Sequence, residues 1–313
     1  MEFRIFRLTF KSGVHIGEGS LGDNSINLRA DTIFSALCIE ALKAGGEELL
    51  NRLVSFAKEG VFLLSDAFPF IKDEYFITKP IMKIQSGQED TDPAEKKLFK
   101  KLKYIPFDMV DDYISGEFDS ETAKYITGKV ESKLGKASIN ARAAVDRLED
   151  TFPYHVGVFT FLENAGLYVI AGGNEEALTA LRELLGALSF AGIGGKRSSG
   201  LGRFTVEEVP MYEDMADRIT GEYPAYMTLS CSLPCEEELE RSLENASYAL
   251  IRRSGFVFSD TYADEALRKK DLYVLGSGSV MRNRFNGDVY DVSNNGGHPV
   301  YKYAKPLFLG VEI

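Results

Sequence analysis

With 313 residues, of which 44% are hydrophobic, the chain is long enough for one large domain or two of ordinary size with packed cores. No run of residues approaches the roughly 20 apolar residues of a membrane span, and the start of the chain lacks an apolar signal core, so we expect a cytosolic (cytoplasmic) protein with no membrane contact. Three cysteines, an odd number, argue against a disulfide framework and fit a reducing compartment.

The net charge of −11 is unfavourable for binding nucleic acid, but the charge is unevenly distributed along the chain. Residues 205–247 contain eleven acids and two bases, whereas residues 95–103 contain five lysines and one glutamate. A local basic face can therefore bind phosphate while the acidic segment faces solvent or a protein partner.

The first elements follow a strand and helix pattern. Alternating apolar residues predict a strand over Phe3 to Phe10. Asp31 directly precedes an apolar periodic run, which predicts that its side chain is the N-cap of a helix from Thr32 to Lys43. Two consecutive glycines end this helix, and a second helical piece covers Glu47 to Glu59.

Two short strands are expected next, Val61 to Leu64 and Tyr75 to Thr78. From about residue 80 to 140 the pattern weakens, and we interpret this region as an insertion that carries a function or a partner contact, because a structureless stretch of this length is uncommon. Its lysine-rich helix, residues 95–103, is interpreted as a solvated helix face.

Regular patterns return after the insertion. Two β-rich runs, Tyr154 to Leu162 and Leu167 to Ala171, are four residues apart and predict a hairpin. Asn174 is the expected cap of a helix from Glu175 to Ser189, whose leucines form one stripe. With a last strand from Arg203 to Val209, the order is β-α-β-β-α-β, which is typical of a ferredoxin-like unit.

The acidic stretch 210–224 is interpreted as a linker to a smaller second domain, residues 225–313. Further elements are expected at Tyr226 to Ser232, Glu236 to Asn245, Lys270 to Val280 and Tyr301 to Glu312. The sequence thus predicts an α+β fold of two ferredoxin-like (RRM-like) domains, the first spanning 1–210 with the insertion at about 80–140.

Between the second helix and the last strand of the first domain lies a segment that we call the glycine loop, Gly192 to Phe204. It holds five glycines, three cations and two hydroxyls. Its amides can form a nest for an anion, to which Lys196, Arg197 and Arg203 add charge and the serines add donors. The natural ligand is a phosphate or a phosphodiester chain, and the simpler alternative is a flexible surface turn.

Two familiar phosphate loops fail the spacing test. A Walker A loop needs glycine where Phe190 stands and a hydroxyl residue where Arg197 stands. A dinucleotide fingerprint needs a small residue at Arg197 or Thr205. What remains is a loop that binds a phosphodiester backbone, which suits nucleic acid as well as a nucleotide.

Cys231 and Cys235 resemble half of a zinc site, but no second pair or nearby histidine completes four ligands. We therefore predict no metal and no cofactor.

Four motifs together resemble one family. They are Val14-His15-Ile16-Gly17, the run Arg29 to Leu37, the glycine loop, and the tail Gly297 to Tyr303. The chain resembles the RAMP superfamily of CRISPR proteins and, within it, the fourth Csm subunit of type III-A effector complexes. This resemblance implies a role in antiviral defence: two RRM-like halves grip the repeat-derived 5′ handle of the CRISPR RNA (crRNA), without catalysis. It also implies contacts with the large polymerase-like subunit and the backbone RAMP subunit.

Carried onto this sequence, the resemblance assigns the handle's backbone to the glycine loop and its neighbourhood. The candidate RNA-binding residues there are His15, Gly194, Gly195, Lys196, Arg197, Ser198, Ser199, Gly200 and Arg203. Weaker candidates, each more often a surface residue, are Arg142, Arg147, Arg282 and Arg284.

His15 offers a competing, enzymatic interpretation. A histidine after the first strand can deprotonate a 2′-hydroxyl, and Lys196 can stabilise the charge of the phosphorane. The alternative function is therefore a metal-independent endoribonuclease that processes CRISPR RNA, and a third is a nucleotide-binding regulator. A hydrogen-bonding role for His15 in RNA binding or structure is favoured, since a lone histidine has many uses. His155 is expected to be structural, and His298 to fix the terminal loop or a partner contact.

Overall fold

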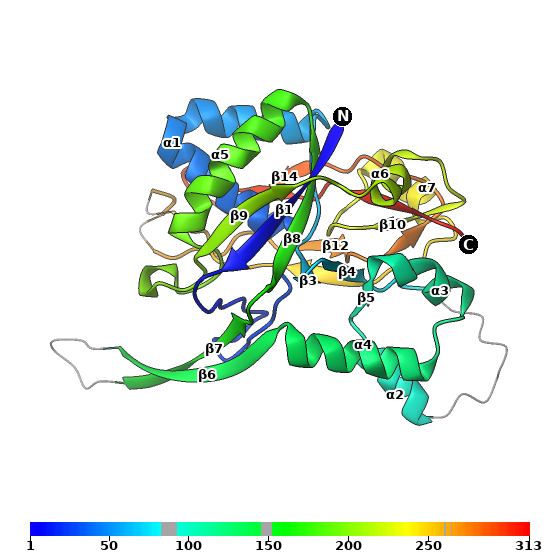
Figure 1. Cartoon of the computed structure of the whole chain (residues 1–313). Coiled ribbons are helices and arrows are strands. Elements are labelled where there is room, and N and C mark those ends of the chain that lie inside the picture. The colour runs from blue at the N-terminus through cyan, green and yellow to red at the C-terminus, as the bar shows by residue number, and fades with distance from the viewer. Residues whose placement is uncertain (83–92, 145–151, 260, 264) are drawn as a thin grey trace.

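A computed structural model of the chain describes residues 1–82, 93–144, 152–259, 261–263 and 265–313. These residues form a mixed α/β fold whose strands pair in antiparallel sheets (Figure 1). The strands are β1 (Glu2–Phe10), β2 (Phe62–Leu64), β3 (Phe68–Ile71), β4 (Glu74–Thr78), β5 (Tyr104–Pro106), β6 (Gly135–Ala144), β7 (Phe152–Phe161), β8 (Ala165–Gly173), β9 (Phe204–Val209), β10 (Ala225–Thr228), β11 (Leu250–Arg253), β12 (Leu272–Leu275), β13 (Val280–Met281), β14 (Val289–Asp291), β15 (Tyr301–Tyr303) and β16 (Phe308–Val311). The helices are α1 (Ala30–Lys58), α2 (Pro93–Lys101), α3 (Val110–Ser115), α4 (Ser120–Lys133), α5 (Glu175–Ala191), α6 (Glu213–Thr220) and α7 (Leu239–Leu243), with the 3-10 turns η1 (Phe107–Met109), η2 (Arg197–Ser199) and η3 (Glu236–Glu238).

The largest sheet has the strand order β5-β4-β3-β8-β1-β9, and β2 also pairs with β8. Strand β8 is buried along its whole length and is central in the sheet, since β1 pairs with one edge and β2 and β3 pair with the other. Helices α1 and α5 lie side by side on one face of this sheet (Figure 1). Both helices and the first strand are thus confirmed.

Helix α5 shows why the local pattern was informative. Its leucine stripe is buried, and the Asn174 side chain accepts a hydrogen bond from the amide of Ala177 as the predicted N-cap. Helix α1 contains the predicted break, since Gly46 takes a φ of 65°, which is unfavourable for other residues.

The start of α1 differs from the prediction. Asp31 is not the N-cap: this position is Arg29, whose side chain makes no capping hydrogen bond. The amide of Ala30 instead donates to Oδ1 of Asp66 at 2.8 Å. The capping carboxylate therefore comes from the connection between β2 and β3, and the side chain of Asp31 is free to take another role.

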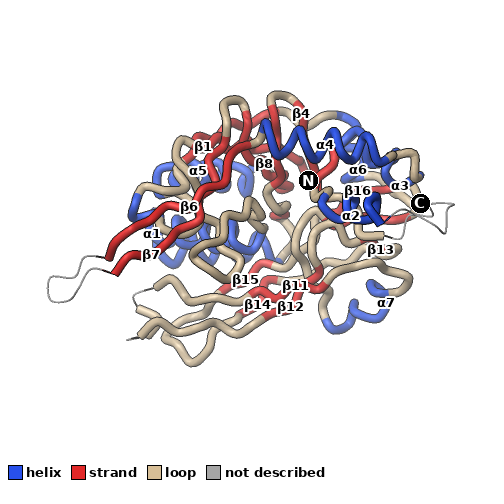
Figure 2. Tube along the Cα trace, turned by 90° about the horizontal axis from the view of Figure 1, so that it is seen from below, coloured by secondary structure: helices blue, strands red, loops and turns tan. Residues whose placement is uncertain are grey.

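The predicted hairpin between residues 154–162 and 167–171 is wrong. Strand β7 pairs with β6 over ten residue pairs, from Gly135 opposite Phe161 to Ala144 opposite Phe152. The reason is that both edges of β8 are already occupied, which leaves β7 no partner there. The β6 and β7 strands form a separate ribbon that runs out from the body of the molecule (Figure 2).

The insertion is well structured where it is described. Strand β5 pairs with β4 and extends the main sheet, and α3 and α4 bury Val110, Tyr113 and Ile126. Helix α2 buries none of its residues, so the prediction of a solvated lysine face is confirmed.

The stretch 210–224 is not a structureless linker. It contains α6, in which Met215 and Ile219 are four residues apart, share one helix face and are both buried. Periodicity over a single short helix surrounded by acids was too weak a signal to predict this packing.

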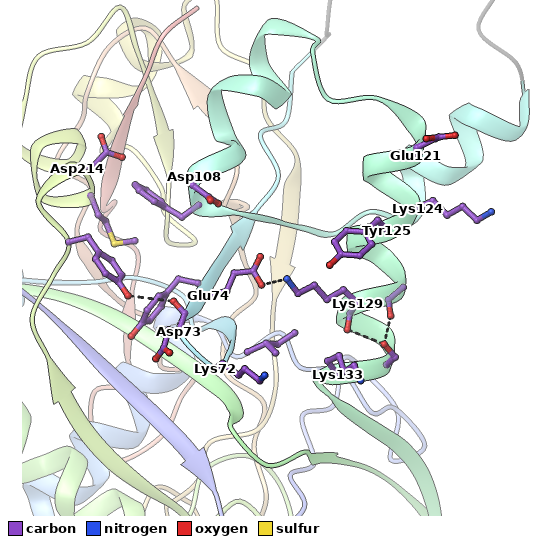
Figure 3. Close-up of a pocket in the computed structure, with 17 residues that line it drawn as sticks. Lys72, Asp73, Glu74, Asp108, Glu121, Lys124, Tyr125, Lys129, Lys133 and Asp214 are labelled. Atoms are coloured by element: carbon purple, nitrogen blue, oxygen red, sulfur yellow. Dashed lines mark hydrogen bonds and ion pairs between the residues drawn. The ribbon is translucent and has the colours of Figure 1, made fainter.

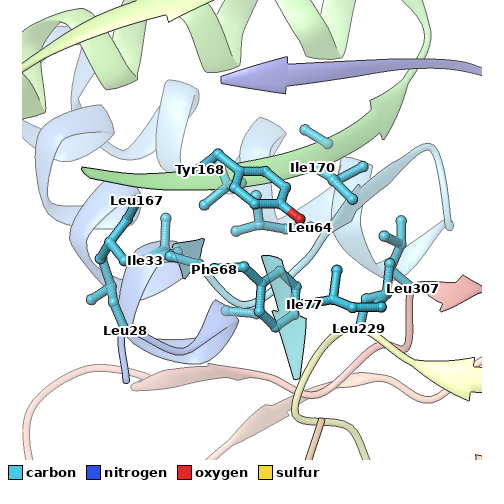
Figure 4. Packing of buried hydrophobic residues seen from close by; sticks show 14 of the residues in the cluster. Leu28, Ile33, Leu64, Phe68, Ile77, Leu167, Tyr168, Ile170, Leu229 and Leu307 are labelled. Atoms are coloured by element: carbon cyan, nitrogen blue, oxygen red, sulfur yellow. The ribbon is translucent and has the colours of Figure 1, made fainter. Parts of the chain in front are cut away.

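The C-terminal part contains a three-stranded sheet, β13-β10-β16, and the ribbons β11-β12 and β14-β15. The expected long strand from Tyr301 to Glu312 is divided into β15 and β16, and the expected helix 236–245 is divided into η3 and α7. Leu229 and Leu307 pack beside Ile77 in one buried cluster with residues of the main sheet (Figure 4). The division at residues 210–225 remains a prediction.

Among the helices of the described ranges, none combines the length and the apolar character that crossing a bilayer requires.

Candidate nucleic-acid interface

The glycine loop connects α5 to β9 and is fastened to the segment that follows β1. The amide of Gly195 donates to the His15 carbonyl at 2.8 Å, and the amide of Gly202 donates to the Gly13 carbonyl at 2.9 Å. The two arms of the loop are also joined, since Ile193 donates to the Gly202 carbonyl at 3.0 Å. These bonds give the loop one defined conformation, unlike a simple surface turn.

Two glycines of the loop cannot be replaced by a residue with a side chain. Gly202 has a φ of 77°, and a Cβ at this position would lie 1.9 Å from the Ile193 carbonyl oxygen. Gly194 has a φ of 89°, and its Cβ would lie 2.5 Å from the His15 carbonyl oxygen. Only a residue without a side chain fits both the backbone angle and the close approach.

Three successive amides of the loop remain available. Lys196 adopts the left-handed conformation, with φ 58° and ψ 30°, and the turn η2 follows it. No hydrogen bond among the described residues uses the amides of Lys196, Arg197 or Ser198. Successive N–H groups at such a change of backbone hand form a concave site for an anion.

The loop forms one wall of a cleft of about 540 Å³. The remainder of the lining comes from residues 15–18 and 27–29 after β1, from the start of α1, from β11 and β15, and from Ser254, Phe258 and Lys269. Six cations and two carboxylates line the cleft: Arg29, Lys196, Arg197, Arg253, Lys269 and Lys302, with Glu18 and Asp31. In a chain with a net charge of −11, this cleft therefore concentrates positive charge.

Asp31 is the centre of a buried ion cluster in the cleft. Its carboxylate, 1% exposed, accepts two hydrogen bonds from Arg253, at 2.8 and 2.9 Å, and one from Lys302 at 2.6 Å. Burial alone would raise the pKa of Asp31, but the charges of Lys302 and Arg253 hold it well below its usual range. One carboxylate is thus shared by two cations, which leaves positive charge uncompensated.

Asp66 joins the start of α1 to the C-terminal part of the chain. Its Oδ1 accepts from the amides of Ala30 and Cys231, at 2.8 and 3.0 Å, and its Oδ2 accepts from Arg29 at 3.1 Å. Arg29 is therefore held in place at the edge of the cleft by a buried carboxylate.

Lys269 lies next to this cluster. Burial lowers the pKa of its ammonium group, the neighbouring charge of Lys302 lowers it as well, and the charge of Asp31 raises it, which leaves the pKa at about 8. The charge of the cleft therefore changes at weakly alkaline pH.

His15 has a defined orientation under the loop. Its ring is 5% exposed, and its Nδ1 donates to the Gly157 carbonyl at 2.8 Å. In the neutral ring this leaves Nε2 as the acceptor. A Cβ on Gly195 would lie 2.6 Å from the ring, so His15 packs directly against the loop.

The structure divides the loop's predicted site residues into two groups. Lys196, Arg197 and Ser198 line the cleft, as do Gly194 and Gly195. Ser199, Gly200 and Arg203 are not part of the lining, and the exposed Arg203 is held through its amide by the Ser12 hydroxyl at 3.1 Å.

Of the four further arginines, the three that the structure describes do not line the cleft. Arg282 and Arg284 donate to carbonyls of residues 219–224, around the end of α6, and α6 lies on the other side of the molecule from the end of α5 where the loop begins (Figures 1 and 2). Arg142 lies on the β6-β7 ribbon. Arg147 lies outside the described residues.

Four cations of the cleft were not predicted from the sequence: Arg29, Arg253, Lys269 and Lys302. Arg29 and Lys302 lie inside two of the quoted motifs, which could have drawn attention to them. No local pattern distinguishes Arg253 or Lys269 from ordinary surface residues.

The cysteines are placed in unlike surroundings. Cys231 is buried, and burial raises the pKa of its thiol well above the usual value, while Cys235 is half-buried beside Glu238. Within the described ranges, no group of three or more histidine, cysteine or acidic side chains could hold a metal ion.

A larger hollow, of about 1430 Å³, lies between α4 and the turn that joins β3 to β4 (Figure 3). Five carboxylates and four lysines line it, and Lys129 forms an ion pair with Glu74 across it. Since its carboxylates outnumber its lysines by one, this hollow is a poorer site for a polyanion than the cleft beside the glycine loop.

Two family models match the chain. The RAMP superfamily matches residues 7–205, and the CRISPR Csm4 C-terminal domain matches residues 221–311. A protein of Mycobacterium tuberculosis described as CRISPR system Cms protein Csm4 is 38% identical over 312 residues, covering 99% of this chain and 98% of that protein. A protein of Streptococcus thermophilus with the same description is 36% identical over 324 residues, covering all of both chains.

Solved structures also resemble the fold. A chain of the Csm3-Csm4 subcomplex from the type III-A CRISPR-Cas interference complex has a TM-score of 0.67 at 19% identity, covering 98% of this chain and 99% of that chain. A chain of the Csm1-Csm4 cassette in complex with cA4 has a TM-score of 0.63 at 18% identity, covering 99% and 98%. At these identities the likeness concerns the fold alone.

Proposed function

This chain belongs to the Csm4 family of the RAMP superfamily, and we propose that it is a non-catalytic RNA-binding subunit of a type III-A CRISPR effector complex. In this proposal the cleft beside the glycine loop holds the backbone of the 5′ repeat-derived handle of the CRISPR RNA. The protein acts in the cytosol, as part of antiviral defence.

One observation carries the RNA-binding proposal. Three free amides of the glycine loop and six cations meet in a single cleft of an otherwise acidic protein. Single-stranded RNA is held by such grooves, in which cations and amides track the phosphates and leave the bases accessible.

The partners are proposed from the solved neighbours. Those structures contain Csm4 chains together with Csm3 or with Csm1. We propose that this chain contacts the corresponding subunits, which the resemblance identifies as the backbone RAMP subunit and the large polymerase-like subunit. The acidic segment 205–247 is the surface that we assign to protein assembly.

We also infer that the chain is built from two ferredoxin-like halves. In the first, the order β3-β8-β1-β9 across the sheet, with α1 after β1 and α5 after β8, supports this arrangement, and β4 to β7 are additional strands between β3 and β8. For the second half, the support is the β13-β10-β16 sheet within the part that the C-terminal family model matches.

The absence of catalysis is part of the proposal. His15 is nearly buried, packs against the loop and is oriented by a backbone carbonyl, which supports a structural role. Incubating the protein with labelled repeat RNA in EDTA tests this assignment. Specific cleavage that is lost in His15→Ala would favour the endoribonuclease instead.

Salt dependence tests the binding site. For single-stranded RNA, each phosphate contact contributes a slope of about 0.7 to the plot of log affinity against log salt. Lys196→Ala/Arg197→Ala should therefore weaken binding of handle RNA and lower the slope by about 1.4. Lys96→Ala/Lys97→Ala, which removes the same charge from exposed positions of α2, is the control and should change neither. An unchanged slope in the loop variant would remove the loop from the RNA path.

A further inference from the structure

The glycine loop lies between two aromatic rings. The Lys196 Nζ atom is 4.6 Å from the ring centroid of Tyr154, and the Arg197 Cζ atom is 4.8 Å from that of Phe258. Tyr154 belongs to β7, whereas Phe258 belongs to the segment after β11. Two consecutive loop residues therefore point to rings from different parts of the fold, with the free amides between them.

The two rings have different surroundings. Tyr154 is half-buried and packs against a small apolar cluster that includes Val156 and Leu201. Phe258 is 72% exposed and lines the cleft. The packing of the free protein thus accounts for Tyr154 but leaves most of the apolar surface of Phe258 in water.

A second exposed phenylalanine accompanies Phe258. Phe256 is 61% exposed and pairs with Arg268, whose Cζ atom is 5.6 Å from its ring centroid. The amide of Val257 donates to the Leu267 carbonyl at 3.0 Å, so the backbone around Phe256 is paired with the backbone around Arg268. Phe256 and Phe258 are therefore two exposed rings, two residues apart, each with an arginine over it.

We infer that Phe258 is a stacking platform for an RNA base whose backbone is held by the glycine loop, and that Phe256 extends the platform to a neighbouring base. The inference rests on the proposed RNA-binding function and adds the residue that receives a base. Every base has a π face, so stacking on a phenyl ring tolerates many sequences. The guanidinium of Arg197 lies over the ring of Phe258, which shows that a flat group can reach the ring from the side of the glycine loop.

The surrounding charge identifies the ligand as RNA instead of an apolar protein surface. Arg197 and Arg268 lie over the two rings, and the cleft beside Phe258 carries six cations. An apolar partner would have to cover these charges without neutralising them, at a large desolvation cost. A base with its phosphate satisfies the ring and the cations together.

The test uses the full-length protein and handle RNA with 2-aminopurine at one position at a time, since the fluorescence of this base is quenched by stacking. Wild-type protein should quench or shift one or two positions. Phe258→Ala should restore their fluorescence to that of the unstacked base and weaken RNA binding about tenfold, with the salt slope unchanged. Phe258→Tyr, which keeps the ring, should behave like wild type.

Tyr125→Ala is the matched control, because Tyr125 is 68% exposed and Lys129 lies over its ring, but on α4. This variant should leave both measurements unchanged.

The outcomes distinguish a failure of the stacking role of Phe258 from a failure of the proposed RNA-binding function. If wild-type protein binds handle RNA but Phe258→Ala binds equally well, or loses affinity without any change in 2-aminopurine fluorescence, the stacking role is refuted and the RNA-binding function stands. If Phe258→Ala impairs only assembly with the other subunits, Phe258 is a protein contact and the inference is refuted as well. If wild-type protein binds no RNA, the proposed function itself fails.

Discussion

Replacing Asp31 with asparagine tests the ion cluster that joins α1 to the C-terminal strands. Asp31→Asn keeps the size of the side chain but removes the negative charge shared by Arg253 and Lys302. The Asp31 and Lys302 side chains are 1% and 5% exposed, so water cannot solvate the ammonium group of Lys302 once the carboxylate charge is lost. Arg253 is 25% exposed, so water partly screens its charge. Removing one partner of such a buried pair costs about 3–5 kcal/mol.

The assay is urea unfolding of the full chain, followed by circular dichroism, at pH 7. Because Arg253 retains some water, we expect the lower part of this range, about 3 kcal/mol. Asp271→Asn is the control: it breaks an exposed pair with Arg252 at 3.7 Å and should cost less than about 1 kcal/mol. If Asp31→Asn costs no more than this control, the cluster does not stabilise the fold as we argue.

The same variant has a characteristic pH dependence. The pKa of Asp31 is lowered on folding, so its contribution is fully present above the unfolded pKa of about 4 and is lost as the pH falls through the folded value. Below pH 7, where Lys269 with its pKa of about 8 is protonated, the stability difference between wild type and Asp31→Asn should therefore be constant down to pH 5 and should shrink only in acid. A difference that grows as the pH falls would contradict the sign of this shift.

Two further predictions concern the cleft. Gly202→Ala should destabilise the protein by about 3 kcal/mol or more and abolish RNA binding, since its methyl group meets the Ile193 carbonyl. Gly200→Ala, with open space at φ 81°, should cost only about 1 kcal/mol. Equal costs of the two variants in urea unfolding would contradict this account of the loop. Lys269, with a pKa of about 8 in a site it shares with Lys302, Asp31 and Arg253, loses its proton as the pH rises, so affinity for handle RNA should fall severalfold between pH 7 and 9. Lys269→Arg stays charged, so its affinity for handle RNA should not fall over this pH range. If the affinity of Lys269→Arg fell with pH as it does in the wild-type protein, Lys269 would be excluded from the binding site.

Elements with local signals could be predicted from the sequence alone. Helix α5 was predicted with its cap because Asn174 and the leucine stripe lie within a few turns of one another. The glycine loop was recognised for a similar reason: positive φ angles and close backbone approaches demand glycine at particular positions, and these glycines are visible in one short segment.

The residues that surround the loop and the pairing of the strands depend on how distant parts of the chain pack together. Asp31 has the local pattern of a helix cap, but its partners Arg253 and Lys302 are 222 and 271 residues away, and Asp66 supplies the cap instead. The β6-β7 pairing likewise depends on the fact that both edges of β8 are filled by distant strands. Contacts at such separations leave no periodic or capping pattern in the sequence, since they depend on how complete elements pack. The sequence therefore identified the glycine loop that we propose to bind phosphates, while packing assembled the cations and Phe258 around the cleft.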